Sequence, residues 1–597
     1  MKKFLLMIFS FVLMISVNAK EPVLLWEKTW NYGDDYISMF SDIATNSKGN
    51  HYAAGSYSDV YGGKVRSNYI YLNGILNKYD KDGSIIWERK YEDDESSVVF
   101  LSVETLSDDG CVVLGLYNYE NFFAESLSLS SKDVSNSIFS SKFGSNEAIL
   151  SDSYFDELVL IRYDKNGDIV WERTINAKPG YDNYSNTILY SKVSVTNDDN
   201  IYVFVNSKDS TLFKYDKNGT KVWSSELYKY SEDENSGTIT YEYPADAKMD
   251  NDGNYIIVGT SRVDVESGSG DDSTSISTYE GTITKKDKDN KTIFSKKYKL
   301  DNKNTEFISV APLNDGNYLL YVINEIEKTN IKFSLIIIDK DGNKISQREI
   351  KNKKINNGNM DSYFELMGEL YSKIYVDKQG NYIFVDYELD PRYKNGEGYA
   401  SLYYDIRVKS IKTYDKDMNL LWTRNTDSSK ELLVKFNIND YNDYLIVGSN
   451  FREYETPPKS LENSFSQSLN ANRIQDSALI MKYSTDYKID KEVEGKGSID
   501  VSLVNAKAGD EITIDAKAED GYRIEKIIVT DKDGNIIKVS GNKFVMPNSD
   551  VTVKVIFTDS PLVNPKTGAI SITFAVIAIS VYAFFQYKYI KTKEMSL

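Results

Sequence analysis

Two residue types that serve many active sites are almost absent from this chain of 597 residues, which has one Cys and one His. A single Cys cannot form an intramolecular disulfide, so we expect Cys111, in an apolar stretch, to be a small buried residue. A single His excludes a His-based catalytic triad and a metal site with several His ligands. We expect His51, which follows a tight turn, to be an ordinary turn residue. We therefore predict no catalytic residues, although the abundant carboxylates leave glycoside hydrolysis by an Asp/Glu pair open.

Positive charge and proline are also scarce. The formal net charge is −18, and an acidic surface does not suit the phosphates of nucleic acid. No glycine-rich loop follows a strand and opens a helix, which argues against a phosphate-binding loop. The chain has 10 Pro but 46 Tyr, a composition that suits a strand-rich fold. We expect no cofactor and no metal.

What the sequence does contain is an internal repeat. The stretch 79–87, Tyr-Asp-Lys-Asp-Gly-Ser-Ile-Ile-Trp, recurs closely at 163–171, 215–223 and 414–422, with degenerate copies at 286–290 and 338–342. Its Asp-Lys-Asp/Asn-Gly core is typical of a tight hairpin, because Asp and Asn bond their own backbone and Gly takes positive φ. The core is too short for a self-contained calcium loop, so we interpret it as a structural turn.

A second tight turn precedes each copy of this repeat. These turns centre on Gly49, Gly110, Asp199, Gly253, Gly316, Gly380 and Asn442. Each unit therefore predicts four antiparallel strands joined by two tight turns, which is one blade of a β-propeller.

The two kinds of turn differ in number, and the difference predicts how the ring closes. The earlier kind occurs seven times, whereas only six turns of the later kind are complete, so the last blade lacks its fourth strand. Residues 24–28 match 85–89 almost residue for residue, and we expect them to pair with the strand at 478–483. The predicted fold class is all-β: a seven-bladed β-propeller closed by an N-terminal strand, then a small all-β module and a C-terminal transmembrane or sorting helix. Rings of six or eight blades remain open.

The Asp-x-x-Gly-x-x-x-Trp pattern across 23–483 resembles the quinoprotein-like (PQQ-repeat-type) propeller, in which a Trp on the last strand of one blade docks on the next blade. The resemblance implies this docking role for Trp26, Trp87, Trp171, Trp223 and Trp422. Quinone-dependent members of that family usually carry a vicinal disulfide, which one Cys forbids. We therefore expect the fold without the cofactor.

The N-terminus has the pattern of a secretory signal peptide. Two lysines precede an apolar run at 4–17, and small residues follow it, which predicts a signal peptide at 1–19 with cleavage after Ala19.

The C-terminus combines a short motif, an apolar run and basic residues. Asn564, Pro565, Lys566, Thr567 and Gly568 precede an apolar run at 569–585 and a tail containing lysines. This order resembles the cell-wall sorting signal of Gram-positive surface proteins, in an NPxTG-like form. The resemblance implies that a sortase cuts between Thr567 and Gly568 and joins the chain to peptidoglycan outside the cell. A membrane anchor that is never cleaved is the alternative.

Between ring and tail the pattern changes to a small strand-rich segment. Ala-Gly-Asp at 508–510, Gly-Tyr at 521–522 and Met-Pro at 546–547 resemble the internalin-B-type bacterial repeat module. The resemblance implies a stalk or spacer. The predicted domains are the signal peptide (1–19), the propeller (20–486), the stalk module (487–559) and the sorting signal (560–597).

The long insertions all fall on one face of the predicted ring. They lie at 118–155, 261–280, 386–407 and 449–477. Loops on a rigid scaffold often carry binding sites, but the Ser- and Asp-rich stretches 126–141 and 266–277 are equally interpreted as disordered decoration. We expect a non-enzymatic surface protein that binds an unknown glycan or protein at this face. A carboxylate-dependent glycan hydrolase or lyase and a scaffold of an envelope complex are the alternatives.

Overall fold

The structure is a computed structural model in which most of the chain between residues 22 and 559 is described. The described residues are 22–33, 36–59, 72–93, 97–117, 120–121, 153–154, 157–175, 191–206, 210–233, 235–267, 274–327, 330–354, 368–389, 406–427, 429–453, 473–484, 486–507, 509–532, 534–547 and 549–559. The chain divides into two compact units. One is Asn18–Thr485, and the other includes Asp486–Leu597.

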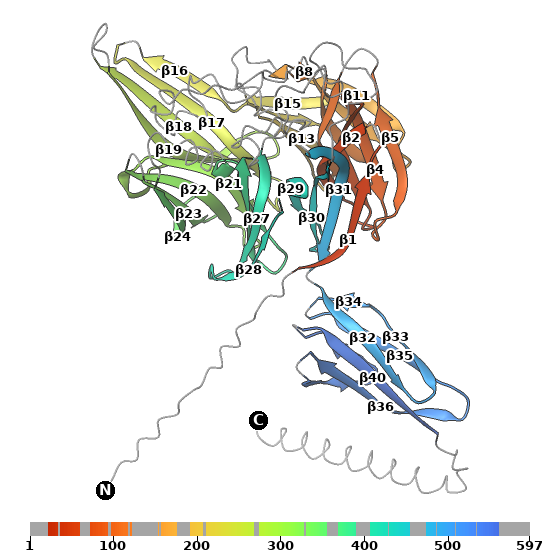
Figure 1. Ribbon diagram of the computed structural model, residues 1–597. Coiled ribbons are helices and arrows are strands. Elements are labelled where there is room, and N and C mark those ends of the chain that lie inside the picture. Colours follow the sequence, from red (N-terminus) through yellow and green to blue (C-terminus); the bar gives the residue numbers. More distant parts are fainter. Residues whose placement is uncertain are drawn as a thin grey trace, which may run out of the picture. The chain divides into compact units, whose positions relative to one another are not determined.

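The larger unit consists of consecutive antiparallel sheets in which neighbouring strands follow one another along the chain (Figure 1). The first three sheets are β2 (Tyr36–Thr45), β3 (His51–Asp59), β4 (Asn73–Tyr79) and β5 (Ile85–Tyr91); β6 (Val98–Thr105), β7 (Cys111–Tyr117), β10 (Glu157–Tyr163) and β11 (Ile169–Ile175); and β12 (Lys192–Val195), β13 (Ile201–Val205), β14 (Thr211–Tyr215) and β15 (Lys221–Glu226). A short pair, β8 (Glu120–Asn121) and β9 (Ser153–Tyr154), lies between β7 and β10 in sequence.

The next three sheets repeat this order. They are β16 (Lys229–Asp233), β17 (Thr238–Met249), β18 (Tyr255–Ser267), β19 (Thr274–Lys286) and β20 (Thr292–Tyr298); β21 (Thr305–Pro312), β22 (Tyr318–Glu327), β23 (Asn330–Ile338) and β24 (Lys344–Lys354); and β25 (Lys373–Val376), β26 (Tyr382–Leu389), β27 (Ile406–Tyr414) and β28 (Leu420–Asn425). A 3-10 turn, η4 (Leu300–Asn302), precedes β21.

The last sheet joins both ends of the unit. It contains β29 (Glu431–Ile438), β30 (Tyr444–Glu453), β31 (Arg473–Ser484) and β1 (Val23–Trp30). Strand β1 pairs antiparallel with β31, from Leu24 opposite Tyr483 to Trp30 opposite Ala478, and the two lie side by side in Figure 1. The pairing predicted for residues 24–28 is therefore present.

The first strands of successive sheets, with β17 taking this place in the five-stranded sheet, contact one another around a common axis. Contacts join β2 to β6, β6 to β12, β17 to β21, β21 to β25 and β29 to β2. An ion pair joins β12 to β17, and an aromatic contact joins β25 to β29. Sheets arranged in this way, with their first strands innermost, form a β-propeller. The order of strands follows from the repeat, because each tight turn joins neighbouring antiparallel strands.

Two expectations about this unit need correction. The insertion at 261–280 is not an irregular loop along most of its length: β18 and β19 pair continuously as far as Ser267 opposite Thr274, and β16 adds a fifth strand to their sheet. Alternating residues such as Val263, Val265 and Ile276 allow the hairpin to extend outward. His51 is also not a turn residue. It opens β3 with 0% of its surface exposed, because Trp26 of β1 packs 5.5 Å from its ring.

The smaller unit packs two sheets around its own core. One sheet contains β32 (Tyr487–Glu494), β34 (Asn505–Ala506), β36 (Tyr522–Asp531), β37 (Ile536–Ile537) and β40 (Val551–Asp559), and the other contains β33 (Gly497–Val501), β35 (Glu511–Ala518), β38 (Val539–Ser540) and β39 (Lys543–Val545). Residues such as Ile512, Phe544 and Val553 form the core between them. Strand alternation sends every second side chain of β40 inward, which explains this core.

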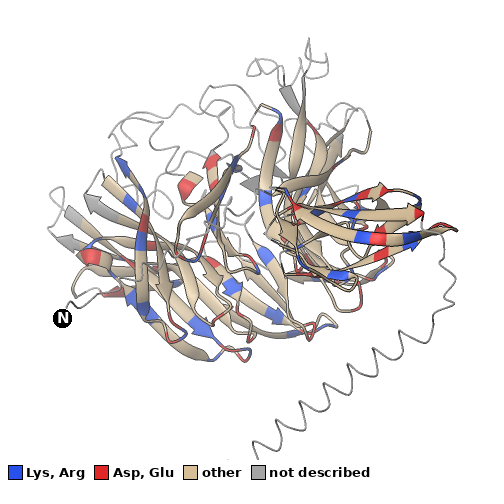
Figure 2. Cartoon of the chain, turned by 90° about the horizontal axis from the view of Figure 1, so that it is seen from below, with Lys and Arg blue, Asp and Glu red and all other residues tan. Residues whose placement is uncertain are grey.

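Acidic and basic residues are interspersed over the strands and turns of both units (Figure 2). Cys111 is free and buried, as predicted. Among the described residues, none of the helices is long and apolar enough to cross a membrane. The predicted signal peptide with Ala19 and the sorting motif from Asn564 to Gly568 lie outside the described residues, as does the apolar run at 569–585.

Candidate functional site

The repeated Asp-Lys turns lie at the outer side of the sheets and are held by their own aspartates. In the turn at Asp80, the carboxylate accepts hydrogen bonds from the backbone N–H groups of Asp82 (3.0 Å) and Ser84 (2.8 Å), and Gly83 has φ of 82°. Equivalent bonds occur at Asp164, Asp216, Asp287 and Asp339. These aspartates already accept backbone hydrogen bonds, which supports their interpretation as structural turn residues. No cluster of three His, Cys, Asp or Glu side chains suited to a metal occurs in the part of the chain that the structure describes.

The predicted docking tryptophans lie beside these turns. Each of four indole N–H groups donates to a Lys carbonyl in the turn of the following sheet: Trp26 to Lys81 (3.1 Å), Trp87 to Lys165 (3.0 Å), Trp171 to Lys217 (3.2 Å) and Trp223 to Lys288 (3.3 Å). Trp422 lies instead against Tyr444, with ring centroids 5.9 Å apart. The bond from Trp26 links the last sheet to the first. We predict that these contacts stabilise the ring, and substitution of a docking tryptophan tests this prediction.

A second set of polar side chains, which the sequence analysis missed, lies at the axis of the ring. We call it the axial layer: one residue from each first strand, namely Asp42, Ser102, Lys192, Asp246, Ser309, Lys373 and Lys435. In five of these strands the pairing register shifts by one residue immediately before the axial residue, as in a β-bulge. A bulge bends the strand and re-aims the next side chain, which accounts for the convergence of these residues.

Glycines on the second strands make room for these bulges. Gly259 pairs with Pro244, just before the bulge that leads to Asp246. A Cβ atom at Gly259 would lie 1.9 Å from the carbonyl oxygen of Tyr243, so only glycine fits without a shift of the backbone.

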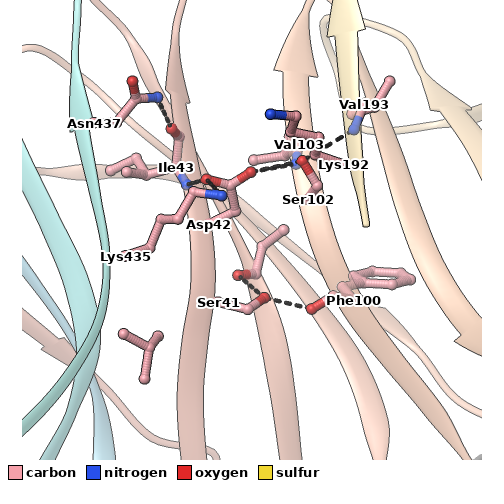
Figure 3. Close-up of polar contacts among 12 residues, drawn as sticks. Ser41, Asp42, Ile43, Phe100, Ser102, Val103, Lys192, Val193, Lys435 and Asn437 are labelled. Atoms are coloured by element: carbon pink, nitrogen blue, oxygen red, sulfur yellow. Dashed lines mark hydrogen bonds and ion pairs between the residues drawn. The ribbon is translucent and has the colours of Figure 1, made fainter. Parts of the chain in front are cut away.

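Asp42 joins the first two sheets through its carboxylate (Figure 3). One oxygen accepts from the Ser102 hydroxyl (2.7 Å) and the Val103 N–H (3.2 Å), and the other accepts from the Ile43 N–H (3.0 Å). Lys435 reaches from β29 to within 3.8 Å of the same carboxylate. Ser102 in turn accepts from the N–H of Val193 on β12. This chain of hydrogen bonds connects three consecutive sheets.

The same arrangement occurs again between β17 and β21, on the opposite side of the ring. Asp246 accepts from the Ser309 hydroxyl (2.8 Å), from the Val310 N–H (3.3 Å) and from its neighbour Ala247. Ser309 accepts from the N–H of Ile374, as Ser102 does from Val193. Lys192 lies 2.7 Å from Asp246 and links the two arrangements. Burial raises the pKa of Asp246, but the positive charges of nearby lysines outweigh this effect and hold the pKa well below its usual range. Lys192 makes the largest contribution among these lysines.

A second row of axial side chains lies two residues further along the same strands, on the same strand face. It includes Glu104, Lys248 and Tyr375, and the Lys248 ammonium lies 5.0 Å from the centre of the Tyr375 ring. These two residues come from sheets that are not neighbours, so their side chains meet across the axis. Burial and then the charge of Asp42 raise the pKa of Glu104 to about 8, whereas burial and then Lys192 lower the pKa of Lys248 to about 7.

The sequence carries a signal for the axial layer that composition and repeat motifs do not reveal. Each axial residue precedes the positive-φ residue of the first tight turn by seven positions, as Asp42 precedes Gly49 and Lys435 precedes Asn442. Read in this register, the layer has the order Asp-Ser-Lys, Asp-Ser-Lys, Lys. The pattern escapes a search for repeats because the residue type changes from sheet to sheet.

Comparison with known proteins gives a family match within the smaller unit and distant structural neighbours of the chain. Residues 487–561 match the family model of the divergent InlB B-repeat domain, which confirms the resemblance of this segment. A search of curated proteins gave no match.

Solved structures similar to this chain include three that cover most of it. The β-propeller domain of the Trilobed protease from Pyrococcus furiosus has 9% identity and a TM-score of 0.32, with 70% of this chain and 95% of that chain covered. YCF48 from Cyanidioschyzon merolae has 10% identity and a TM-score of 0.33, with coverage of 71% and 96%. A protein of unknown function from Dyadobacter fermentans has 9% identity and a TM-score of 0.31, with coverage of 77% and 99%. By its own sheet arrangement the chain is a β-propeller protein. Within its smaller unit, residues 487–561 are similar to the divergent InlB B-repeat domain.

Proposed function

We propose that this protein is a non-enzymatic binding or adhesion protein, displayed on the surface of a Gram-positive bacterium, whose propeller binds a glycan or protein ligand. The observation that carries the proposal is the state of the axial carboxylates. Asp42 and Asp246 each accept three hydrogen bonds within the protein, in addition to a nearby lysine, so their lone pairs already serve the joints between sheets. Lysines from several sheets face the same axis, and we infer that their ammonium groups contact the ligand.

We propose further that the ring is a seven-bladed propeller closed by the N-terminal strand, of the PQQ-repeat type but without its cofactor. The four indole-to-turn hydrogen bonds support this, because each joins the outer strand of one sheet to the turn of the next. Closure by the N-terminal strand completes the last sheet, so that only the outer strands of the ring keep a free edge.

The surface location rests on the two chain ends and on the module between ring and tail. We propose secretion through the signal peptide at 1–19 and attachment to peptidoglycan by a sortase that cuts between Thr567 and Gly568. A divergent InlB B-repeat domain at 487–561 supports this order, since a bacterial repeat module suits a spacer between a binding domain and the wall.

One observation favours a glycan-active enzyme as the second candidate. The pKa of Glu104 is raised to about 8, so its carboxyl group is neutral at pH 7 and could donate a proton, as the general acid of a glycoside hydrolase does. Asp42, the nearest axial carboxylate, would have to serve as its partner while accepting hydrogen bonds from Ser102 and Val103.

A binding screen with product analysis separates these candidates. The labelled full-length chain is applied to glycan and extracellular-matrix arrays, and each bound ligand is analysed for cleavage. The binding proposal predicts retention of an intact ligand that Glu104→Gln leaves unchanged. A shortened glycan, produced by the wild-type chain and not by Glu104→Gln, would contradict it. An absence of binding on both arrays would exclude the glycan and matrix ligands that they carry. A protein partner within the envelope would then be the remaining candidate.

A further inference from the structure

Lysines outnumber ionised carboxylates at the axis of the ring. Lys192, Lys248, Lys373 and Lys435 come from four different first strands. Lys192 pairs with Asp246 at 2.7 Å, and Lys435 lies 3.8 Å from Asp42. Among the described residues, Lys248 and Lys373 have neither a hydrogen bond nor an ion pair with any group. In the described part of the chain, these two lysines therefore have no carboxylate in direct contact, although the Lys248 ammonium lies over the Tyr375 ring.

The order of residues in the axial layer explains why Lys373 has no aspartate on the following sheet. In the first half of the ring Lys192 is followed by Asp246 on the next sheet, and the two form an ion pair. Lys373 holds the same place in the second half, but the next sheet presents Lys435 instead of an aspartate. Lys435 turns to Asp42 on its other side (Figure 3). The repeat is thus interrupted by one additional lysine, and positive charge accumulates at that point.

The nearby carboxyl groups balance this charge only in part, because the one carboxylate of Asp246 attracts Lys192, Lys373 and Lys248 together. Asp42 and Asp246 are the acceptors in the joints between sheets, and Glu104 is uncharged at pH 7 because its pKa is raised to about 8. Burial lowers the pKa of Lys373, and burial followed by the charge of Lys192 lowers that of Lys248 to about 7, although the charge of Asp246 opposes both shifts. Bringing an anion to these groups would relieve the repulsion among them.

The lysines also remain accessible, unlike the aspartates they accompany. The side chain of Lys435 is 33% exposed and that of Lys192 is 15% exposed, whereas those of Asp42 and Asp246 are 7% and 2% exposed. Lys248 and Lys373 are partly exposed as well. At the axis the lysine side chains are therefore more exposed than the carboxylates with which they pair.

We propose that the axial layer is an oxyanion-binding site in which Lys248, Lys373 and Lys435 bind a phosphate or carboxylate group. Lysine ammonium groups recognise such oxyanions as point charges, each with three hydrogen-bond donors. The Glu104 carboxyl in the neighbouring row is neutral at pH 7 and does not repel the anion. The proposal rests on the binding function proposed above and gives the chemistry of its ligand: an acidic group, free or carried by a larger glycan or protein.

Calorimetric titration of the full-length chain with inorganic phosphate and with acetate, at constant ionic strength, tests the proposal directly. We expect saturable binding of at least one of these anions, weakened at least tenfold by Lys373→Met and retained in Lys373→Arg. Lys221→Met, which removes an exposed lysine from the outer strand β15, is the matched control and should bind as the wild type does.

The outcomes separate this inference from the function on which it rests. An absence of anion binding, or equal weakening by Lys221→Met and Lys373→Met, would overturn the oxyanion site. If Lys373→Met does not fold, the test depends on Lys373→Arg, which keeps the positive charge. A folded Lys373→Arg variant that does not bind the anion would contradict the proposal. Array binding that survives in Lys373→Met would preserve the binding function and reject the axial site. Among bound array ligands, acidic glycans or acidic proteins support the site, whereas exclusively neutral ones contradict it.

Discussion

The outer turns and the axial layer of the ring differ in how they use the same residue types. At the outer turns Asp, Lys and Gly recur with nearly the same neighbours, and each Asp bonds the backbone of its own turn. At the axis Asp and Lys alternate with Ser, and each Asp bonds a different sheet. The repeated part builds the scaffold. At the axial layer, where the residue type changes from sheet to sheet, opposite charges lie close together. We propose the binding site at this layer.

The largest expected effect distinguishes aspartates of the two regions. Asp246→Ala should lower the free energy of unfolding by about 3–5 kcal/mol, because it leaves Lys192, Ser309 and two backbone N–H groups without their acceptor in a buried place. Asp216→Ala, at an outer turn, should cost about 1 kcal/mol. Urea unfolding of both variants measures the difference. Equal losses would remove the contrast between axis and turns.

A pair of glycines tests whether the bulged strands need close backbone contact. Gly259→Ala should cost about 3 kcal/mol, because the new Cβ would lie 1.9 Å from the Tyr243 carbonyl oxygen and the packed strands must move. Gly253→Ala, in the adjoining turn, has open space around it and should cost about 1 kcal/mol for its φ of +77°. Thermal unfolding of the two variants gives the comparison, and a smaller loss at Gly259 would be inconsistent with the bulge geometry.

His51 makes the closure of the ring sensitive to acid. Burial lowers its pKa to about 3 in the folded chain, below the ordinary 6.5, so between these values the folded state binds fewer protons than the unfolded state. Its contribution is complete above pH 6.5 and declines as the pH falls. Between pH 6.5 and 5 the wild type should lose about 2 kcal/mol relative to His51→Gln. Unfolding midpoints at the two pH values measure this change, and a constant difference between the chains would exclude the titration of His51.

The smallest expected effect concerns the docking tryptophans. Trp87→Phe keeps an aromatic ring but loses the hydrogen bond to the Lys165 carbonyl, and should cost about 1 kcal/mol. It should leave ligand binding unchanged. Tyr230→Phe, which removes an exposed hydroxyl bonded to Glu232 within the same strand, provides the control and should leave the unfolding midpoint where it is. A loss of ligand in Trp87→Phe would place function at the outer turns.

The sequence was sufficient for the features that depend on local chemistry. Asp-Lys-x-Gly predicts its turn because the Asp carboxylate and the glycine φ act within five residues, and the match of residues 24–28 to later strands predicts the pairing of β1 with β31. The InlB-type module was recognisable from its own landmarks.

Features that depend on distant residues were not predicted. The burial of His51 requires Trp26 from the other end of the ring, and the axial layer requires residues from every first strand. The extended hairpin of β18 and β19 is not predicted, because its Ser and Asp content obscures the alternation of Val263, Val265 and Ile276. Local pattern describes each sheet, whereas the site arises between sheets.

The most direct test of the division between scaffold and site compares two double variants on the same arrays. Lys373→Met/Lys435→Met removes axial charge, and Lys221→Met/Lys344→Met removes the same charge from the outer strands. We predict that the axial variant loses the ligand retained by the wild type, that the outer variant keeps it, and that both remain folded. Retention of the ligand by a folded axial variant would contradict the location of the site at the axis.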